Sequence, residues 1–317
     1  MTHRRHFLAA ALSSAVLPAH AAFSADGPAR ERPGALKGVL LDVAVAGARL
    51  VAVGERGHVL LSDDQGKTWR QAKAVPTRTT LTSLHATDAK TLWAAGHGGI
   101  ILKSVDAAEN WTLVTGKADG PDVLLAIRVD ADGRGLAVGG FGIALATADA
   151  GKTWKPGPLL DGEAGEKHLN RILVSGAGTW LIAAEGGHVL RADPARGKWT
   201  AVKTPYAGSL WSGLALKGGA LLVGGMRGNV VRSADDGLTW THQPIAQAGS
   251  FTGATMLPDG RPVLVGVDGT VVVGDAAGEK FALTRLEDRA TLTAAAMAGP
   301  TLIAASTAGM RTLDLPK

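Results

Sequence analysis

The sequence contains no cysteine, and after its first 21 residues it has no long apolar run. Without cysteine, neither a disulfide framework nor a thiolate metal site can form. No later stretch reaches the roughly 18 consecutive apolar residues that a membrane-spanning helix requires. Strong charge is also missing, because the formal net charge is only +5 and the lysines and arginines are scattered. We therefore expect no nucleic-acid partner.

Residues 1–21 have the features of an export signal. Arg4 and Arg5 begin a twin-arginine signature, a short apolar core follows over residues 7–17, and residues 19–21 read Ala-His-Ala, a cleavage pattern. We expect a twin-arginine signal peptide over 1–21, export to the periplasm, and a mature domain over 22–317. A retained N-terminal anchor is the alternative interpretation.

A short motif recurs along the chain. It reads Ser-x-Asp-x-Gly-x-Thr-Trp at residues 62–69 and again at 233–240, with Thr for Ser at 147–154, and weaker copies lie near residues 104–111, 193–199 and 275–281. The aromatic residues that end the copies are 41 to 45 residues apart. This period, together with short apolar runs separated by Gly and Asp, is typical of propeller blades.

The motif residues are predicted to shape a turn. The Asp can accept backbone N–H groups, the Gly can take the positive φ that closes the turn, and the aromatic ring can fill the space between sheets. We assign a structural role to these pairs: Asp64 and Trp69, Asp106 and Trp111, Asp149 and Trp154, Asp193 and Trp199, and Asp235 and Trp240.

The arithmetic of the repeats predicts an all-β, seven-bladed β-propeller with four-stranded antiparallel blades. The seventh repeat, which starts at Leu292, is one strand short. A strand from the N-terminal lead-in, around residues 30–36, is expected to complete it and so remove an open sheet edge. Six blades with a separate C-terminal hairpin are the alternative.

The turns between the second and third strands of the blades should share one face, opposite the Asp motifs. Glycines frame these turns, while the residues between them vary in charge and shape, as expected of a binding surface on a constant frame. The candidate partner-binding residues there are Glu55, Arg56, His97, Phe141, Glu185, Arg227 and Asp268.

Two further candidates border the predicted central channel. Asp42 and Arg171 occupy the third position of their innermost strands, where the other blades have small residues. They are either channel-facing recognition groups or simply hydrated side chains, and the sequence leaves both open.

Catalytic patterns are not evident. His58 and His188 share a register, but they fall on blades that are not neighbours, so no metal site is predicted. No Gly-x-Ser-x-Gly elbow is present. Glycoside hydrolysis requires two carboxylates about 5–10 Å apart, and the loop carboxylates fall on different blades. We expect neither an enzyme nor a cofactor, with a carbohydrate-binding or glycoside-hydrolase propeller as the alternative.

The motif resembles the Asp-box of the bacterial neuraminidase repeat. The segment from Leu40 to Trp69 resembles, more closely, the blades of the photosystem II stability and assembly factor family. That resemblance implies a non-enzymatic, seven-bladed propeller that binds protein partners during assembly of a membrane complex, and some members are encoded near RND-type exporters. It does not imply a photosystem partner for this chain.

The resemblance leads us to expect a monomer that binds a periplasmic or membrane protein complex. Photosystem members of the family use an arginine-rich patch, whereas Arg56 and Arg227 form no obvious cluster in the sequence. The sialidase relatives of the repeat use a tyrosine nucleophile and an Arg-Ile-Pro segment. This chain has only Tyr206, in a predicted linker, and Arg32-Pro33 without the isoleucine, so the resemblance does not imply a sialidase.

Overall fold

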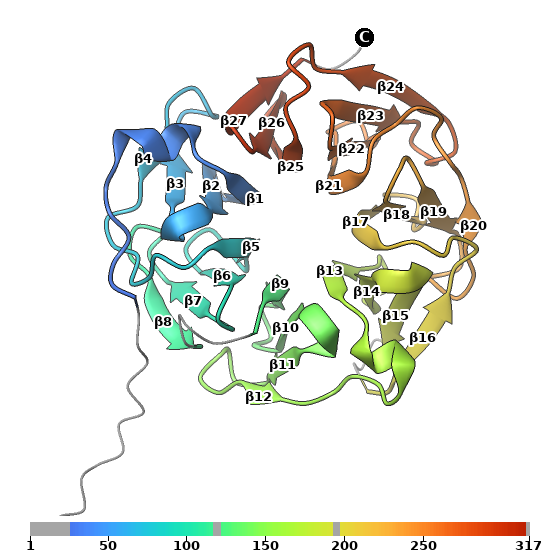
Figure 1. Cartoon of the computed structure of the whole chain (residues 1–317), viewed down its shortest axis with the longest axis horizontal. Coiled ribbons are helices and arrows are strands. Elements are labelled where there is room, and N and C mark those ends of the chain that lie inside the picture. Colours follow the sequence, from blue (N-terminus) through green and yellow to red (C-terminus); the bar gives the residue numbers. More distant parts are fainter. Residues whose placement is uncertain (1–25, 117–121, 193–196, 315–317) are drawn as a thin grey trace, which may run out of the picture.

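Seven small antiparallel sheets surround a central opening (Figure 1). The computed structural model describes residues 26–116, 122–192 and 197–314. Within these ranges six sheets have four strands and one has three, and the strands of each sheet follow chain order. The predicted seven-bladed propeller is therefore confirmed. The predicted signal peptide and Asp193 lie outside the described residues.

The strands of blades 1 to 4 run from the hub outward in chain order. Blade 1 has β1 (Leu40–Ala46), β2 (Arg49–Gly54), β3 (Val59–Ser62) and β4 (Arg70–Gln71); blade 2 has β5 (Leu81–Ala86), β6 (Leu92–Gly96), β7 (Ile101–Ser104) and β8 (Thr112–Thr115); blade 3 has β9 (Leu124–Val129), β10 (Gly135–Gly139), β11 (Ala144–Thr147) and β12 (Lys155–Pro156); blade 4 has β13 (Leu169–Val174), β14 (Trp180–Ala184), β15 (His188–Ala192) and β16 (Trp199–Lys203).

Blades 5 to 7 repeat the pattern. Blade 5 has β17 (Leu210–Ala215), β18 (Leu221–Gly225), β19 (Val230–Ser233) and β20 (Thr241–His242); blade 6 has β21 (Phe251–Met256), β22 (Pro262–Gly266), β23 (Thr270–Gly274) and β24 (Phe281–Arg285); blade 7 has β25 (Leu292–Ala298), β26 (Thr301–Ser306) and β27 (Gly309–Leu313).

Helical structure in the described residues is limited to short 3₁₀ turns. These are η1 (Pro33–Lys37), η2 (Glu55–Gly57), η3 (Gly140–Gly142), η4 (Glu163–Glu166) and η5 (Glu185–Gly187). None of the helices in the described part of the chain is long and apolar enough to cross a membrane.

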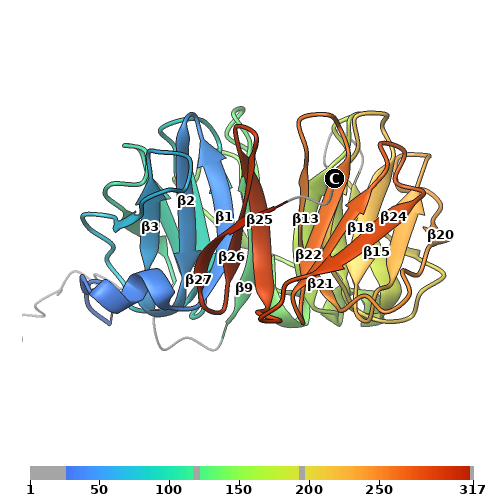
Figure 2. The same cartoon turned by 90° about the horizontal axis from the view of Figure 1, so that it is seen from above.

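The antiparallel order of the strands separates two faces of the ring, which Figure 2 shows from the side. The turns between the second and third strands lie on one face, together with the linkers between blades. In blade 1, for example, the N–H of Glu55 donates to the carbonyl of Val39 at 3.0 Å. We call this the turn face. The Asp motifs connect the third and fourth strands and lie on the opposite face, which we call the motif rim.

The Asp motif makes the hydrogen bonds that its residue types suggest. In the first copy the Asp64 carboxylate accepts the N–H of Thr68 at 2.9 Å and its hydroxyl at 2.6 Å, and it also accepts the hydroxyl of Ser62 at 2.8 Å. Trp69 closes the turn by donating its ring N–H to Gly66 at 3.1 Å. The copies at Asp149 and Asp235 have the same bonds to Thr153 and Thr239.

A β-bulge near the start of each innermost strand leaves one residue without a partner on the second strand. A bulge re-aims a side chain, and here several bulged residues bond the next blade. Thr82 donates to the carbonyl of Leu124, and Asn170 donates to that of Leu210 at 2.8 Å. These bonds tie neighbouring blades together around the hub.

The N-terminal lead-in does not take the place predicted for it. Residues 33–37 form the helix η1 beside β27 rather than a fourth strand of blade 7, which has three strands in the described residues. Pro33 has no N–H to give to a strand ladder. The preceding residues bond blade 1 instead: Ala29 donates to Val75 at 2.9 Å, and the side chain of Gln71 bonds the backbones of Arg30 and Arg32.

Direct packing of blade 7 against blade 1 closes the ring. Thr293, a bulged residue of β25, donates its hydroxyl to the carbonyl of Leu40 at 2.7 Å. A shared apolar cluster unites the two blades and η1, with members that include Ala35, Leu40, Leu50, Leu60, Ala294, Ile303 and Ala305. Closure therefore rests on side-chain burial between inner strands, and not on an added outer strand.

Candidate functional site

Four tips of the turn face hold a non-glycine residue in the left-handed backbone region. Arg56, Phe141 and Arg227 have φ of 54°, and Asp268 has φ of 59°. All four side chains are exposed. The left-handed conformation costs a residue with a Cβ about 1–2 kcal/mol. The sequence therefore places varied, solvent-facing side chains at these tips in spite of a backbone cost.

Two of the predicted site residues have a structural task instead. The carboxylate of Glu55 accepts the N–H of Val39 at 3.2 Å, and that of Glu185 accepts the N–H of His168 at 3.3 Å. Each thus fastens a turn to the start of its own blade. His97 is exposed on the turn face.

The third loop carboxylate on this face is also engaged. Asp268 pairs with Arg285 at 3.2 Å and with Arg289 at 3.1 Å. Glu55, Glu185 and Asp268 lie on blades 1, 4 and 6, so they do not combine into the carboxylate pair of a glycoside hydrolase.

A basic pocket opens on blade 1. Its volume is about 160 Å³, and its lining is Arg30, Arg32, Arg56, His58 and Arg78. Within the described residues, no carboxylate forms an ion pair with any of these four arginines. We call it the arginine pocket. It differs from the expectation that Arg56 belongs to no cluster, while Arg227 lies outside the lining.

Three separate segments assemble the arginine pocket. The lead-in supplies two arginines, the tip of η2 supplies Arg56, and the linker between blades 1 and 2 supplies Arg78. Asp26 fixes the linker by accepting the hydroxyl of Thr77 at 2.9 Å and the N–H of Arg78 at 2.8 Å. The guanidinium of Arg78 donates back to the carbonyl of Pro28 at 3.2 Å. The lead-in and the linker therefore hold each other in place.

His58 is the one buried side chain in this lining. It is 5% exposed, and its Nδ1 atom has no hydrogen-bond partner. Burial lowers the pKa of His58, and the nearby charges of Arg56 and Arg32 lower it further, against the opposing effect of Glu55. A neutral imidazole with an unused nitrogen thus borders a cluster of uncompensated positive charge. Leaving a buried polar atom unpaired costs free energy, so the pocket is suited to a ligand that carries oxygen atoms.

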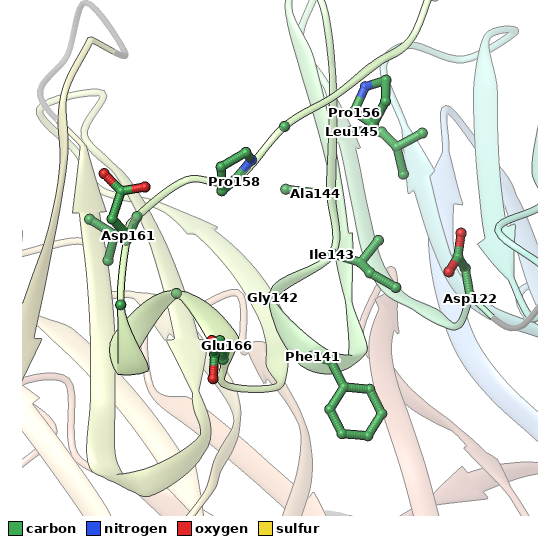
Figure 3. Close-up of a pocket in the computed structure, with 14 residues that line it drawn as sticks. Asp122, Phe141, Gly142, Ile143, Ala144, Leu145, Pro156, Pro158, Asp161 and Glu166 are labelled. Carbon is green, nitrogen blue, oxygen red and sulfur yellow. The ribbon is translucent and has the colours of Figure 1, made fainter.

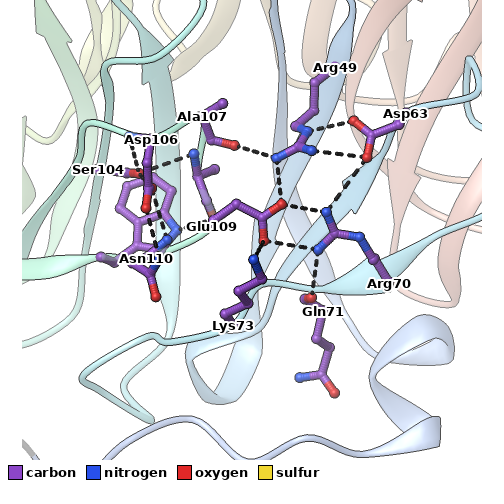
Figure 4. Close-up of polar contacts among 12 residues, drawn as sticks. Arg49, Asp63, Arg70, Gln71, Lys73, Ser104, Asp106, Ala107, Glu109 and Asn110 are labelled. Carbon is purple, nitrogen blue, oxygen red and sulfur yellow. Dashed lines mark hydrogen bonds and ion pairs between the residues drawn. The ribbon is translucent and has the colours of Figure 1, made fainter.

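The motif rim carries a cluster of charges that is satisfied internally (Figure 4). Arg49 pairs with Asp63 at 2.6 Å and with Glu109 at 3.0 Å, and Arg70 pairs with Glu109 at 2.5 Å. The two arginines, Arg70 foremost, lower the pKa of Glu109. Because each charge faces an opposite one across blades 1 and 2, this cluster joins blades and leaves no net charge for a ligand.

Asp42 and Arg171 meet across the hub. The guanidinium of Arg171 lies 3.1 Å from the carboxylate of Asp42, although β13 and β1 belong to blades 4 and 1. Asp42 is only 1% exposed, and it also accepts the N–H groups of Val43 at 3.0 Å and Leu84 at 2.9 Å. It is therefore not a hydrated channel group. The pair joins opposite parts of the ring.

Sequence reasoning missed the arginine pocket because its members are far apart in the chain. A signal existed in the lead-in, where two arginines lie two residues apart. It could not be used, because the lead-in was expected beside blade 7. Among the described residues, no group of three or more His, Asp or Glu side chains could hold a metal ion.

No family model matches the chain, and no curated protein matches it. Solved structures are similar in fold. YCF48 bound to a D1 peptide superposes with a TM-score of 0.70 at 16% identity, covering 89% of this chain and 94% of that one. YCF48 from Cyanidioschyzon merolae gives 0.66 at 15% identity, covering 90% and 97%. The WD40 propeller domain of Doa1 gives 0.68 at 14% identity, covering 90% and 94%.

At these identities the similarity is one of fold. The chain is a seven-bladed propeller like the YCF48 structures and the Doa1 domain, and one of those YCF48 structures holds a peptide.

Proposed function

We propose that this chain is a non-enzymatic binding propeller that docks a protein partner through its turn face, with the arginine pocket as the anchor. The partner would present an acidic segment to the pocket. In the finer form of the proposal, the chain is exported and serves as an assembly or accessory factor for an envelope membrane complex, of which an RND-type exporter is one candidate.

The observation that carries the proposal is the uncompensated charge of the pocket. Four guanidinium groups without carboxylate partners surround a half-enclosed space beside the free nitrogen of His58. Guanidinium groups are planar donors that match carboxylates with two parallel hydrogen bonds. Charges of one sign held close together repel one another unless a ligand compensates them. An acidic peptide segment supplies both the charge and the acceptors.

The fold comparison supports a protein partner over a glycan. YCF48, which is similar over most of this chain, is a propeller that holds a peptide. In this chain the loop carboxylates that glycoside hydrolysis would require are engaged in internal bonds. The mature-chain binding surface therefore offers donors for an anion, and no acid and base set for a sugar.

The test compares charge reversal in the pocket with charge reversal elsewhere. The double variant Arg32→Glu/Arg56→Glu places acids in the pocket, and Lys152→Glu makes the same kind of change on the motif rim. Hydrogen bonds to charged groups contribute about 1.5–3 kcal/mol each. We expect the double variant to weaken binding of a labelled hexaglutamate peptide, read by fluorescence anisotropy, by at least about tenfold. The Lys152→Glu protein should bind as wild type.

The biological partner is sought with the same variants. Affinity capture from solubilised envelope should retain a membrane-complex protein with the wild type and with Lys152→Glu, and lose it with the double variant. Thermal unfolding should be unchanged, because the guanidinium groups of Arg32 and Arg56 make no internal bond in the described residues. Binding on a glycan array, with no protein captured, would overturn the proposal in favour of a carbohydrate-binding propeller.

A further inference from the structure

Blade 3 has a groove on its outer side that the other observations leave unexplained (Figure 3). Its volume is about 540 Å³. Half-buried apolar side chains of Ile143, Leu145 and Leu160 line it, and Pro156 and Pro158 form part of its wall. We call it the blade 3 groove.

The groove exists because the outer strand of blade 3 is cut short. β12 pairs with β11 at only two positions, whereas β16 pairs with β15 at five. Pro156 and Pro158 lack the N–H groups that a longer ladder would use. The chain therefore leaves β11 after Gly157, whose N–H donates to Ala144 at 3.1 Å, and it runs through η4 before reaching blade 4. Apolar side chains of β11 and its preceding turn stay uncovered along this departure.

Phe141 marks one end of the groove. It is 78% exposed, the largest exposed fraction among the large apolar side chains of the described residues. Its φ of 54° is unfavourable for a bulky residue, and the equivalent tips of blades 2 and 4 are the glycines Gly98 and Gly186. The ring touches only the edge of the fold, with its centroid 4.6 Å from that of His168. An aromatic side chain held outward at a backbone cost is suited to contact with a partner.

Acidic side chains surround the groove. Asp122, Asp161 and Glu166 are exposed members of its lining, and Figure 3 shows Asp122 and Asp161 on opposite sides. Within the described ranges none of the three forms an ion pair, whereas the adjacent Glu163 pairs with Lys167 at 2.7 Å. An apolar floor between unpaired carboxylates complements a ligand that combines apolar side chains with positive charge.

We infer that the blade 3 groove binds an extended segment of a partner protein in which basic residues alternate with aliphatic or aromatic ones. Alternation puts apolar side chains on one side of an extended chain and the basic ones on the other. The apolar side would lie on Leu145, Leu160 and the Phe141 ring, and the basic residues would reach the carboxylates. The inference rests on the proposed function only in assigning protein binding to this molecule, since the arginine pocket selects the opposite charge.

The probe is a fluorescein-labelled hexapeptide of alternating lysine and leucine, titrated with the full chain and followed by anisotropy. We expect saturable binding, which weakens at least fivefold when glutamate replaces lysine in the peptide and when serine replaces leucine. Phe141→Gly should weaken binding at least fivefold. Because glycine accepts a φ of 54° without strain, its unfolding midpoint should not fall, so lost binding cannot be ascribed to unfolding. The double variant Asp161→Asn/Glu166→Gln should weaken binding and reduce its salt dependence.

Controls separate this inference from the proposed function. Leu238→Ser removes an exposed apolar side chain from the motif rim and should bind the peptide as wild type. Arg32→Glu/Arg56→Glu should also bind it as wild type, so a failure of the arginine pocket proposal leaves this result standing. Equal affinity for the lysine and glutamate peptides, or unchanged binding by Phe141→Gly, would overturn the inference. So would concentration-dependent dimerisation that Phe141→Gly abolishes, because the occupant would then be a second copy of this chain.

Discussion

The pair formed by Asp42 and Arg171 leads to an asymmetric stability prediction. Asp42→Ala removes the acceptor of two buried backbone N–H groups, those of Val43 and Leu84. A buried donor without a partner costs about 1–3 kcal/mol. The arginine is 37% exposed and can turn toward water. We therefore expect Asp42→Ala to lower the free energy of unfolding by about 3 kcal/mol.

The reverse substitution should cost less. In Arg171→Ala the carboxylate of Asp42 keeps its two backbone donors and loses one charged donor at 3.1 Å. Breaking a fully buried ion pair costs about 3–5 kcal/mol, but the exposure of the guanidinium reduces this value. We expect a loss of about 1–2 kcal/mol, with a coupling energy near 1 kcal/mol in the double variant.

The measurement is equilibrium unfolding in urea for both single variants and the double variant, with fluorescence and circular dichroism required to give coincident transitions. Ser212→Ala is the matched control, because Ser212 has the same register in blade 5 and makes one longer bond, of 3.3 Å, to Phe251. It should cost under about 1 kcal/mol. If Arg171→Ala proves as costly as Asp42→Ala, or if the coupling energy is near zero, the assignment of Asp42 as the centre of the hub is wrong.

Acid should destabilise the fold through two different sets of groups. Burial, followed by the charge of Arg128, lowers the pKa of His85 to about 4; an unfolded histidine titrates near 6.5, so the stabilising effect is fully present above pH 6.5 and is lost as pH falls toward 4, by at most about 3 kcal/mol. Urea unfolding at pH 7 and pH 4 should show this loss, and His85→Gln should reduce it; an equal pH dependence in both proteins would contradict the assignment. Hydrogen bonds, chiefly from the threonines of the motif, lower the pKa of Asp64, Asp149 and Asp235 to about 2, so a second loss should begin below pH 4 and continue to pH 2. Asparagine at all three positions should remove this second step, and persistence of the step in that variant would show that other carboxylates cause it.

Local repetition made the blades predictable. Each motif copy contains its own donors and acceptors within eight residues, as between Asp64 and Thr68, so its turn could be derived without knowledge of the ring. The count of seven followed from the spacing of the aromatic residues. Glycine positions likewise located the turn face, and Arg56 and Phe141 project from it as expected.

Contacts between distant segments could not be derived in the same way. The pairing of Asp42 with Arg171 spans 129 residues and depends on the diameter of the closed ring. The arginine pocket depends on the path of the lead-in, and Pro33 directs that path away from a strand. The repeat pattern is silent about such unique positions, because a pattern reports what the blades have in common, while recognition depends on what distinguishes one blade from another.

The contact between β25 and β1 separates this molecule from linear repeat arrays. An array can lose a terminal unit and keep the others, because each unit touches only its neighbours. Here Thr293 and the cluster around Leu40 and Ile303 make the last blade a neighbour of the first. Damage at either end therefore propagates in both directions around the circle, and we expect the wheel to open as one cooperative unit rather than to fray from a terminus.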